Sequence, residues 1–212
     1  MQIIPSILAT SPEQYQKDFY KLSKCEGLKM GWVHIDFADN IFVQNETVKV
    51  DTVEKFPADF KKEAHLMVSE PKAWIDDLIN AGFERIIVHV EIEGVAQVIN
   101  YIKSKGIEAG IAIKNETAIE KLEVFKSKID TVLIMSIVAG FQGQPFIPQV
   151  LEKVRQLKSM GGYARIGVDG AVRDKNIREI ADSGADFVIV GSYLLQGDTD
   201  ENLENLWEVI NG

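Results

Sequence analysis

Two side chains that could bind a metal ion or transfer a proton lie inside an otherwise apolar stretch, residues 32–39. Apolar residues alternate there with His34 and Asp36, and a period of two predicts a buried strand with both polar side chains on one face. Burying them costs several kcal/mol, roughly 2 to 7 for a polar group alone, unless a charge or hydrogen bond compensates. A bound metal ion would compensate this cost, and so would a structural pair in which His34 and Asp36 satisfy each other and their neighbours.

The rest of the chain predicts the elements that position this pair. Short β-rich runs alternate with amphipathic helical patterns throughout, which is typical of a parallel sheet covered by helices. We predict eight strands, each followed by a helical pattern, at about residues 3–8, 32–39, 62–68, 85–90, 109–113, 131–137, 165–168 and 187–190, with a last helix over 200–210. Eight such units predict an α/β protein with a (β/α)8 TIM barrel in one domain, residues 1–212. The alternative is an open doubly wound sheet, but no G-x-G-x-x-G motif follows the first strand.

A barrel of this kind carries its catalytic residues at the carboxyl ends of the strands. Polar residues occur at those predicted ends, namely Ser6, His34, Asp36, His65, His89, Glu91, Ser136 and Asp169. Two imidazoles and two carboxylates among them, His34, Asp36, His65 and Asp169, make a mixed nitrogen and oxygen set that suits one divalent ion such as zinc, iron, manganese or cobalt. These residues come from three strands and form no compact motif such as H-E-x-x-H, so their spacing alone leaves the metal site a hypothesis.

Three glycine-containing loops follow the last three predicted strands. They are residues 140–144, Gly170-Ala171 and Gly191-Ser192. Glycine lets the backbone approach a ligand closely and present N–H groups, and the loops after strands seven and eight of such barrels commonly hold phosphate. Ordinary turns are the alternative explanation for any one of these glycines, but three adjacent loops favour a phosphate site.

Composition limits the possible partners. The chain has 212 residues, a net charge of -9 and a pI near 4.9, and its 23 Lys and Arg are scattered, which disfavours nucleic acid and anionic membranes. An anionic small molecule stays possible, since backbone N–H groups can bind phosphate. The single cysteine, Cys25, excludes an intramolecular disulfide and a Cys-rich zinc site and is expected to pack in the core. Without a signal-peptide pattern or a long apolar run, we expect a soluble cytoplasmic protein.

Taken in order, the motifs resemble the ribulose-phosphate 3-epimerase family, including its relatives that act on allulose 6-phosphate. The resemblance covers nearly the whole chain and implies the same barrel, of the ribulose-phosphate-binding type. The segments that carry it are Pro5-Ser6-Ile7-Leu8, His34-Ile35-Asp36 with Asp39, His65-Leu66-Met67-Val68, Val88-His89-Val90-Glu91, Met135-Ser136, Gly143-Gln144-Pro145-Phe146-Ile147-Pro148, Val168-Asp169-Gly170 and Gly191-Ser192.

By this resemblance, His34, Asp36, His65 and Asp169 match the metal ligands of the family, and Asp36 and Asp169 also match its acid/base pair. The implied activity is metal-dependent inversion at C3 of a ketose phosphate in the pentose phosphate pathway, from D-ribulose 5-phosphate to D-xylulose 5-phosphate. A homo-oligomer is implied as well. The implied substrate-binding residues are Ser6, His65, Met67, Met135, Gly140, Gly143, Gly170, Ala171, Gly191 and Ser192.

The chain also departs from the family pattern. Ala38 replaces a methionine, which we expect to leave space over the substrate, and Asn40 replaces a turn glycine. Gln142 stands where a small residue is common, and Ala171 replaces a glycine and could donate its N–H at a negative φ. Two alternatives therefore stay open, an allulose-6-phosphate 3-epimerase and a catalytically idle sugar-phosphate-binding barrel. A phosphoketose decarboxylase is disfavoured, because Ala38 occupies the lysine position of its Asp-x-Lys-x-x-Asp pattern.

Overall fold

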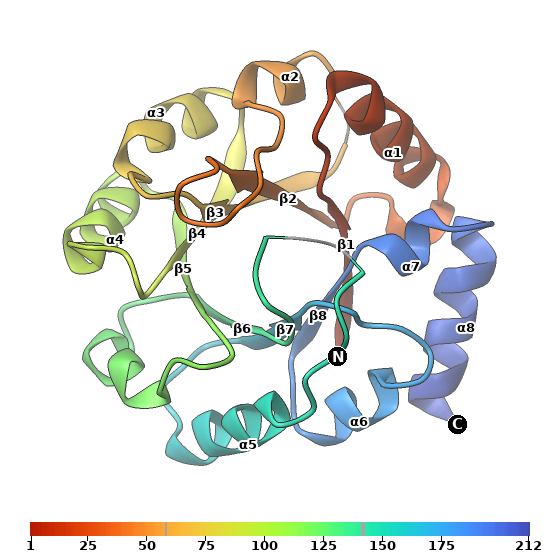
Figure 1. The fold of residues 1–212 in the computed structure, drawn as a ribbon. Helices are drawn as coiled ribbons and strands as arrows, with labels where there is room; N and C mark the ends of the chain where they lie inside the picture. Colours follow the sequence, from red (N-terminus) through yellow and green to blue (C-terminus); the bar gives the residue numbers. More distant parts are fainter. Residues whose placement is uncertain (58, 141–142) are drawn as a thin grey trace.

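The computed structural model describes residues 1–57, 59–140 and 143–212. Eight parallel strands close into a barrel in sequence order, with the helices around it (Figure 1), which confirms the predicted TIM barrel. The strands are β1 (Gln2–Ile7), β2 (Trp32–Ala38), β3 (Lys61–Met67), β4 (Phe83–His89), β5 (Glu108–Ile113), β6 (Thr131–Met135), β7 (Ile166–Asp169) and β8 (Phe187–Val190).

Helices follow most strands as predicted, with one exception. The α-helices are α1 (Pro12–Lys24), α2 (Val50–Glu54), α3 (Lys72–Asn80), α4 (Val95–Ser104), α5 (Val150–Met160), α6 (Ile177–Asp182), α7 (Ser192–Leu195) and α8 (Thr199–Asn211), and η1 (Glu26–Leu28) is a 3-10 turn. After β5 the chain forms the 3-10 helix η2 (Ile119–Phe125) instead of an α-helix. Its buried residues Ile119, Leu122 and Phe125 are three apart, and residues so spaced eclipse one another in a 3-10 helix. The helical pattern predicted after this strand is therefore found as a 3-10 helix.

Local signals set the element ends. The Ser11 side chain caps α1 by accepting a hydrogen bond from the N–H of Gln14, and Pro12 occupies the first turn. Strand β6 ends two residues earlier than predicted. The next residue, Ser136, donates its N–H and hydroxyl to the carbonyl of Asp169 and its hydroxyl also to that of Gly170. Cys25 is buried at the end of α1, as expected. In the part of the chain that the structure describes, the search for a helix able to cross a membrane finds none.

The alternation in β2 separates two environments. Val33, Ile35 and Phe37 belong to the large apolar cluster between the barrel and its helices, whereas His34 and Asp36 alternate with them and face the interior. A smaller apolar cluster inside the barrel contains Ile4, Ile87, Ala112, Leu133, Met135, Phe187 and Ile189. The interior therefore has apolar side chains on one side and polar side chains around β2 and β3.

Candidate active site

The four predicted metal ligands meet inside the barrel, near the carboxyl ends of β2, β3 and β7. Asp36 Oδ1 lies 2.8 Å from His65 Nδ1 and 3.3 Å from His34 Nε2. Asp169 Oδ2 lies 3.7 Å and 3.9 Å from the same two nitrogens. All four side chains are buried, and one ligand atom from each lies within 4.8 Å of the other three. The strand register causes this, since Asp36 pairs with His65 across β2 and β3.

An unsatisfied nitrogen provides an independent test of a metal site. His34 Nε2 is one of the few buried side-chain atoms of the described residues that have no hydrogen-bond partner. Its ring is already anchored at Nδ1, which lies 2.7 Å from Glu63 Oε1. A neutral imidazole that donates from Nδ1 has its lone pair at Nε2, directed to the carboxylates. Two imidazole nitrogens and two carboxylate oxygens fit one divalent ion with mixed ligands.

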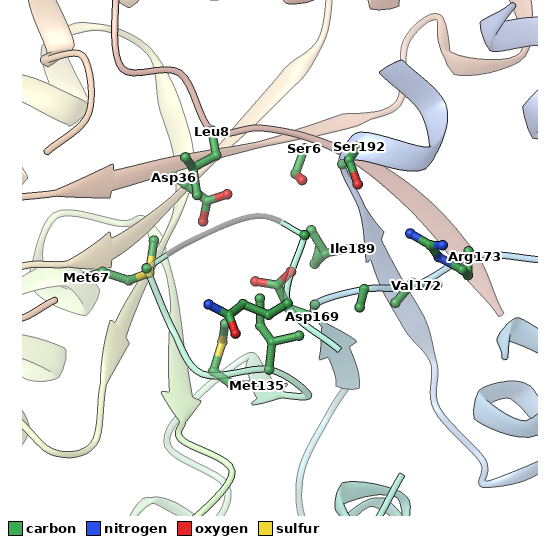
Figure 2. A pocket seen from close by; sticks show the side chains of 17 residues that line it. Ser6, Leu8, Asp36, Met67, Met135, Asp169, Val172, Arg173, Ile189 and Ser192 are labelled. Atoms are coloured by element: carbon green, nitrogen blue, oxygen red, sulfur yellow. The ribbon is translucent and has the colours of Figure 1, made fainter. Parts of the chain in front are cut away.

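Asp36 and Asp169 point toward each other across the pocket (Figure 2), and their environments differ. Burial raises the pKa of Asp169 to about 6, and the nearby charge of Asp36 adds to this. Burial also opposes ionisation of Asp36, but the two neighbouring imidazoles of His34 and His65 outweigh it and hold the Asp36 pKa well below its usual range. Carboxyl groups whose pKa values are pushed apart in this way are suited to act as an acid and a base.

The pocket above these carboxylates has about 600 Å³ of empty space, including its open mouth. Nine of the ten predicted substrate-binding residues line it, namely Ser6, Met67, Met135, Gly140, Gly143, Gly170, Ala171, Gly191 and Ser192. His65 does not line it and lies buried among the ligand atoms. The sequence did not single out Leu8, Ile137, Val172, Arg173 or Ile189, which also contribute to the wall. Met67, Met135 and Ser6 surround the two carboxylates in Figure 2.

Two residues of the loop after β7 have a left-handed backbone. Gly170 has φ +117°, and a Cβ there would lie 2.5 Å from Ile137 Cγ1, so a side chain is excluded. Ala171 has φ +52°, so the negative φ that we considered for this alanine is not observed. The left-handed backbone is held locally, since Asn176 Nδ2 donates to the Ala171 carbonyl at 2.9 Å. Phe141 and Gln142 of the predicted phosphate loop lie outside the described residues.

The second imidazole of the cluster, His65, also has a partner at the ring nitrogen that faces away from the carboxylates. His65 Nε2 lies 3.0 Å from His89 Nε2, and His89 Nδ1 lies 3.0 Å from Glu91 Oε2. If His65 presents Nδ1 to a metal, its Nε2–H donates to His89, and His89 in turn donates from Nδ1 to Glu91. Burial lowers the pKa of His89 to about 4, which suits a neutral ring in this chain of donors. His89 and Glu91 were placed from the sequence at a strand end and in a family motif, and no contact with the metal ligands was assigned to them.

Together the barrel and a cluster of two histidines and two aspartates at its carboxyl end define the active-site architecture of a TIM-barrel enzyme. The family model for the ribulose-phosphate 3 epimerase family matches residues 2–195. Ribulose-phosphate 3-epimerase of Chlamydia muridarum is 35% identical over 176 residues, which cover 79% of this chain and 77% of that protein. The Schizosaccharomyces pombe protein of the same name is 34% identical over 221 aligned residues, covering 100% and 91%.

The chain belongs to the ribulose-phosphate 3-epimerase family and is therefore an isomerase, an epimerase of carbohydrate phosphates. This confirms the resemblance found in the sequence motifs. Among solved structures, 3-hexulose-6-phosphate synthase from Salmonella typhimurium superimposes with a TM-score of 0.73 over 100% of this chain and 99% of that one. Its sequence identity is only 16%, so this likeness shows the barrel fold alone.

Proposed function

We propose that the protein interconverts D-ribulose 5-phosphate and D-xylulose 5-phosphate by inverting C3, and that residues 1–212 act as one barrel domain with one divalent metal ion. The observation that carries this proposal is the pair of carboxylates, Asp36 and Asp169, that point toward each other across one pocket and lie beside two buried histidines. Membership of the epimerase family supports it.

Inversion at C3 requires two proton carriers on opposite faces of the sugar. One carboxylate removes the C3 proton, which leaves a planar enediolate, and the other carboxyl group returns a proton to the opposite face. Starting from one epimer, one of the two aspartates, Asp36 or Asp169, is the base and the other is the acid. In the reverse direction the two residues exchange roles.

We propose that His34 Nε2, His65 Nδ1 and one oxygen each from Asp36 and Asp169 hold the ion, which is zinc, iron, manganese or cobalt. When bound, the ion supplies a Lewis acid that stabilises negative charge on the substrate oxygens at C2 and C3. The protein contributes the orientation of the carboxylates, since each must reach C3 from its own side of the pocket. Met67 and Met135 cover the apolar edge of the pocket, and Ser6 offers a hydroxyl beside the reacting centre.

The phosphate end of the substrate belongs at the loops after β7 and β8. Gly170, Ala171, Gly191 and Ser192 line that part of the pocket and offer backbone N–H groups. Arg173 is the only lysine or arginine among the described lining residues, and in Figure 2 its guanidinium reaches toward Ser192 and Ile189. Because the rest of the pocket carries two carboxylates, we propose that Arg173 attracts the dianionic phosphate to this end and so orients C3 toward the carboxylates.

The decisive assay measures deuterium exchange at C3 of D-ribulose 5-phosphate in D2O, together with the formation of D-xylulose 5-phosphate, by NMR. Metal-replete protein should do both, and a chelator should abolish both until metal is restored. Exchange with allulose 6-phosphate but not with D-ribulose 5-phosphate would identify the hexulose phosphate as the substrate instead. Binding without turnover of either sugar would identify an idle binding barrel and contradict the proposal. The resemblance also implies a cytoplasmic homo-oligomer, which sedimentation of the purified protein would test for its oligomeric part.

A further inference from the structure

A row of four ionisable side chains runs across the barrel interior from the metal-ligand cluster to the floor. His34, Glu63, Arg85 and Glu108 are direct register partners across β2, β3, β4 and β5, so they lie side by side on the same face. Glu63 and Arg85 are 0% and 1% exposed. Two full charges in such a position need a reason, because an apolar pair of similar size would fill the space at no electrostatic cost.

The hydrogen bonds along this row are continuous. Glu63 Oε1 lies 2.7 Å from His34 Nδ1, and Glu63 Oε2 accepts from Arg85 Nη1 at 2.6 Å. Arg85 Nε in turn donates to Glu108 Oε2 at 2.7 Å. Each carboxylate oxygen of Glu63 therefore has its own partner, one on each neighbouring strand, and this fixes the plane of the carboxylate.

Arg85 is itself held in one orientation. Its guanidinium carbon lies 3.9 Å from the centre of the Trp32 ring, a stacking contact, while Glu108 binds its edge. The guanidinium is thus a rigid support for Glu63 and not only a counter-charge. A lysine could neutralise Glu63 but could not bridge the two carboxylates in one plane.

The two imidazole ligands use opposite nitrogens, and each has a different support. His34 presents Nε2 to the cluster and is backed at Nδ1 by Glu63, whereas His65 presents Nδ1 and is backed at Nε2 by His89. The chain behind His65 ends at Glu91, which is satisfied by the N–H of Lys114 at 2.9 Å. The carboxylate behind His34, Glu63, is instead paired with a side-chain cation, the guanidinium of Arg85.

We propose that Glu63 and Arg85 are positioning residues, which hold His34 with its proton on Nδ1 and its Nε2 lone pair directed at the metal ion, and thereby set the affinity of the site. This inference rests on the proposed metal-dependent function. Neither residue lines the substrate pocket, so both act on the site through His34. The floor of the barrel is in this way part of the metal centre.

The test compares the Co²⁺ and Zn²⁺ affinities of the wild-type protein with those of Glu63→Gln and Arg85→Met, by competition with a chromophoric chelator. We expect each substitution to weaken binding 10- to 100-fold, as the loss of a carboxylate behind a histidine ligand does elsewhere. The visible absorption of bound Co²⁺ should also change, because it reports ligand geometry. Glu84→Gln is the matched control. It removes an exposed carboxylate of the same strand as Arg85, which among the described residues pairs only with Lys61 at 3.7 Å and lies outside the row, and it should keep affinity within about threefold of wild type.

A double variant separates positioning from folding. Glu63→Gln/Arg85→Gln contains no unpaired buried charge, and we expect it to fold and to bind metal no more weakly than the weaker single variant, since both residues act through one histidine. With metal in saturating excess, the Glu63→Gln variant should recover most of its kcat at an unchanged KM. If folded Glu63→Gln binds metal with wild-type affinity and an unchanged Co²⁺ spectrum, the inference is overturned while the proposed metal site stands. If Glu63→Gln does not fold, the same result in the double variant overturns it. Absence of stoichiometric metal binding by the wild-type protein would instead overturn the proposed metal site, and the inference with it.

Discussion

Replacing Asp169 by asparagine should separate proton removal from inversion. The amide has the shape of the carboxyl group and keeps one oxygen as a metal ligand, but it cannot carry a proton to or from C3. Asp36 stays intact on the opposite side of the pocket (Figure 2). Asp169→Asn should therefore lose epimerisation while still exchanging the C3 proton of the one epimer whose proton faces Asp36. Asp36→Asn should show the converse pattern, with exchange in the other epimer only.

The size of the effect follows from the role of the lost group. A positioned general acid or base contributes about 10²- to 10⁴-fold, which corresponds to roughly 2.7 to 5.4 kcal/mol in the activation free energy. Metal binding should suffer less, because Asp169 Oδ2 lies 3.7 Å and 3.9 Å from the imidazole nitrogens, whereas Asp36 Oδ1 lies 2.8 Å and 3.3 Å from them. We therefore expect Asp169→Asn to retain metal more readily than Asp36→Asn.

Proton NMR in D2O measures both processes in one sample, since the C3 signal disappears on exchange and new signals appear on inversion. Each sugar phosphate is supplied separately, with the metal content of each variant determined beforehand. If metal-loaded Asp169→Asn exchanges both epimers equally, or retains more than about a tenth of the wild-type epimerisation rate, the assignment of two carriers on opposite faces is wrong.

Three further predictions address the phosphate end, the loop geometry and pH. Arg173→Gln should raise KM about tenfold with little change in kcat, and the difference should shrink in high salt, whereas Arg155→Gln on an exposed helix face should change neither. Gly170→Ala, whose Cβ would meet Ile137 at φ +117°, should lower the free energy of unfolding in urea by about 2–4 kcal/mol. Burial opposes ionisation of Asp39, but four hydrogen bonds from two loops outweigh it and lower the Asp39 pKa. The wild-type protein should thus have a higher melting temperature than Asp39→Asn. This difference should be full above pH 3.8 and disappear as pH falls through the lowered pKa.

The barrel could be predicted from the sequence because its alternation is strong and local. A period of two in residues 32–39 fixes which side chains face the interior, and the same rule applied to eight strands gives the closed sheet. The ends of elements were less predictable. Strand β6 stops at Met135, and Ser136 then bonds to the carbonyls of Asp169 and Gly170 at the end of β7, contacts that exist only once the barrel is closed.

The row of four ionisable side chains across β2 to β5 was not predicted from the sequence, for a different reason. Glu63 and Arg85 fall on the same alternating positions as His65 and His89, so the pattern could have placed them inside the barrel. Charged residues near the start of a strand are usually assigned to solvent, because they are rarely buried without a partner. Their partnership comes from the register of three strands, which a single sequence does not give.

The departures near Asp36 alter the site less than the sequence suggested. Ala38 is 1% exposed, packs in an apolar cluster with Val43 and Met67, and does not line the pocket. The expected space over the substrate is therefore not found at that position. Asn40 adopts φ +58° and donates its N–H to the Asn45 carbonyl at 2.7 Å, so the turn keeps the left-handed residue that glycine would supply. Differences in sugar preference must then arise from side chains that do line the pocket, and these are the positions to exchange when pentulose and hexulose phosphates are compared.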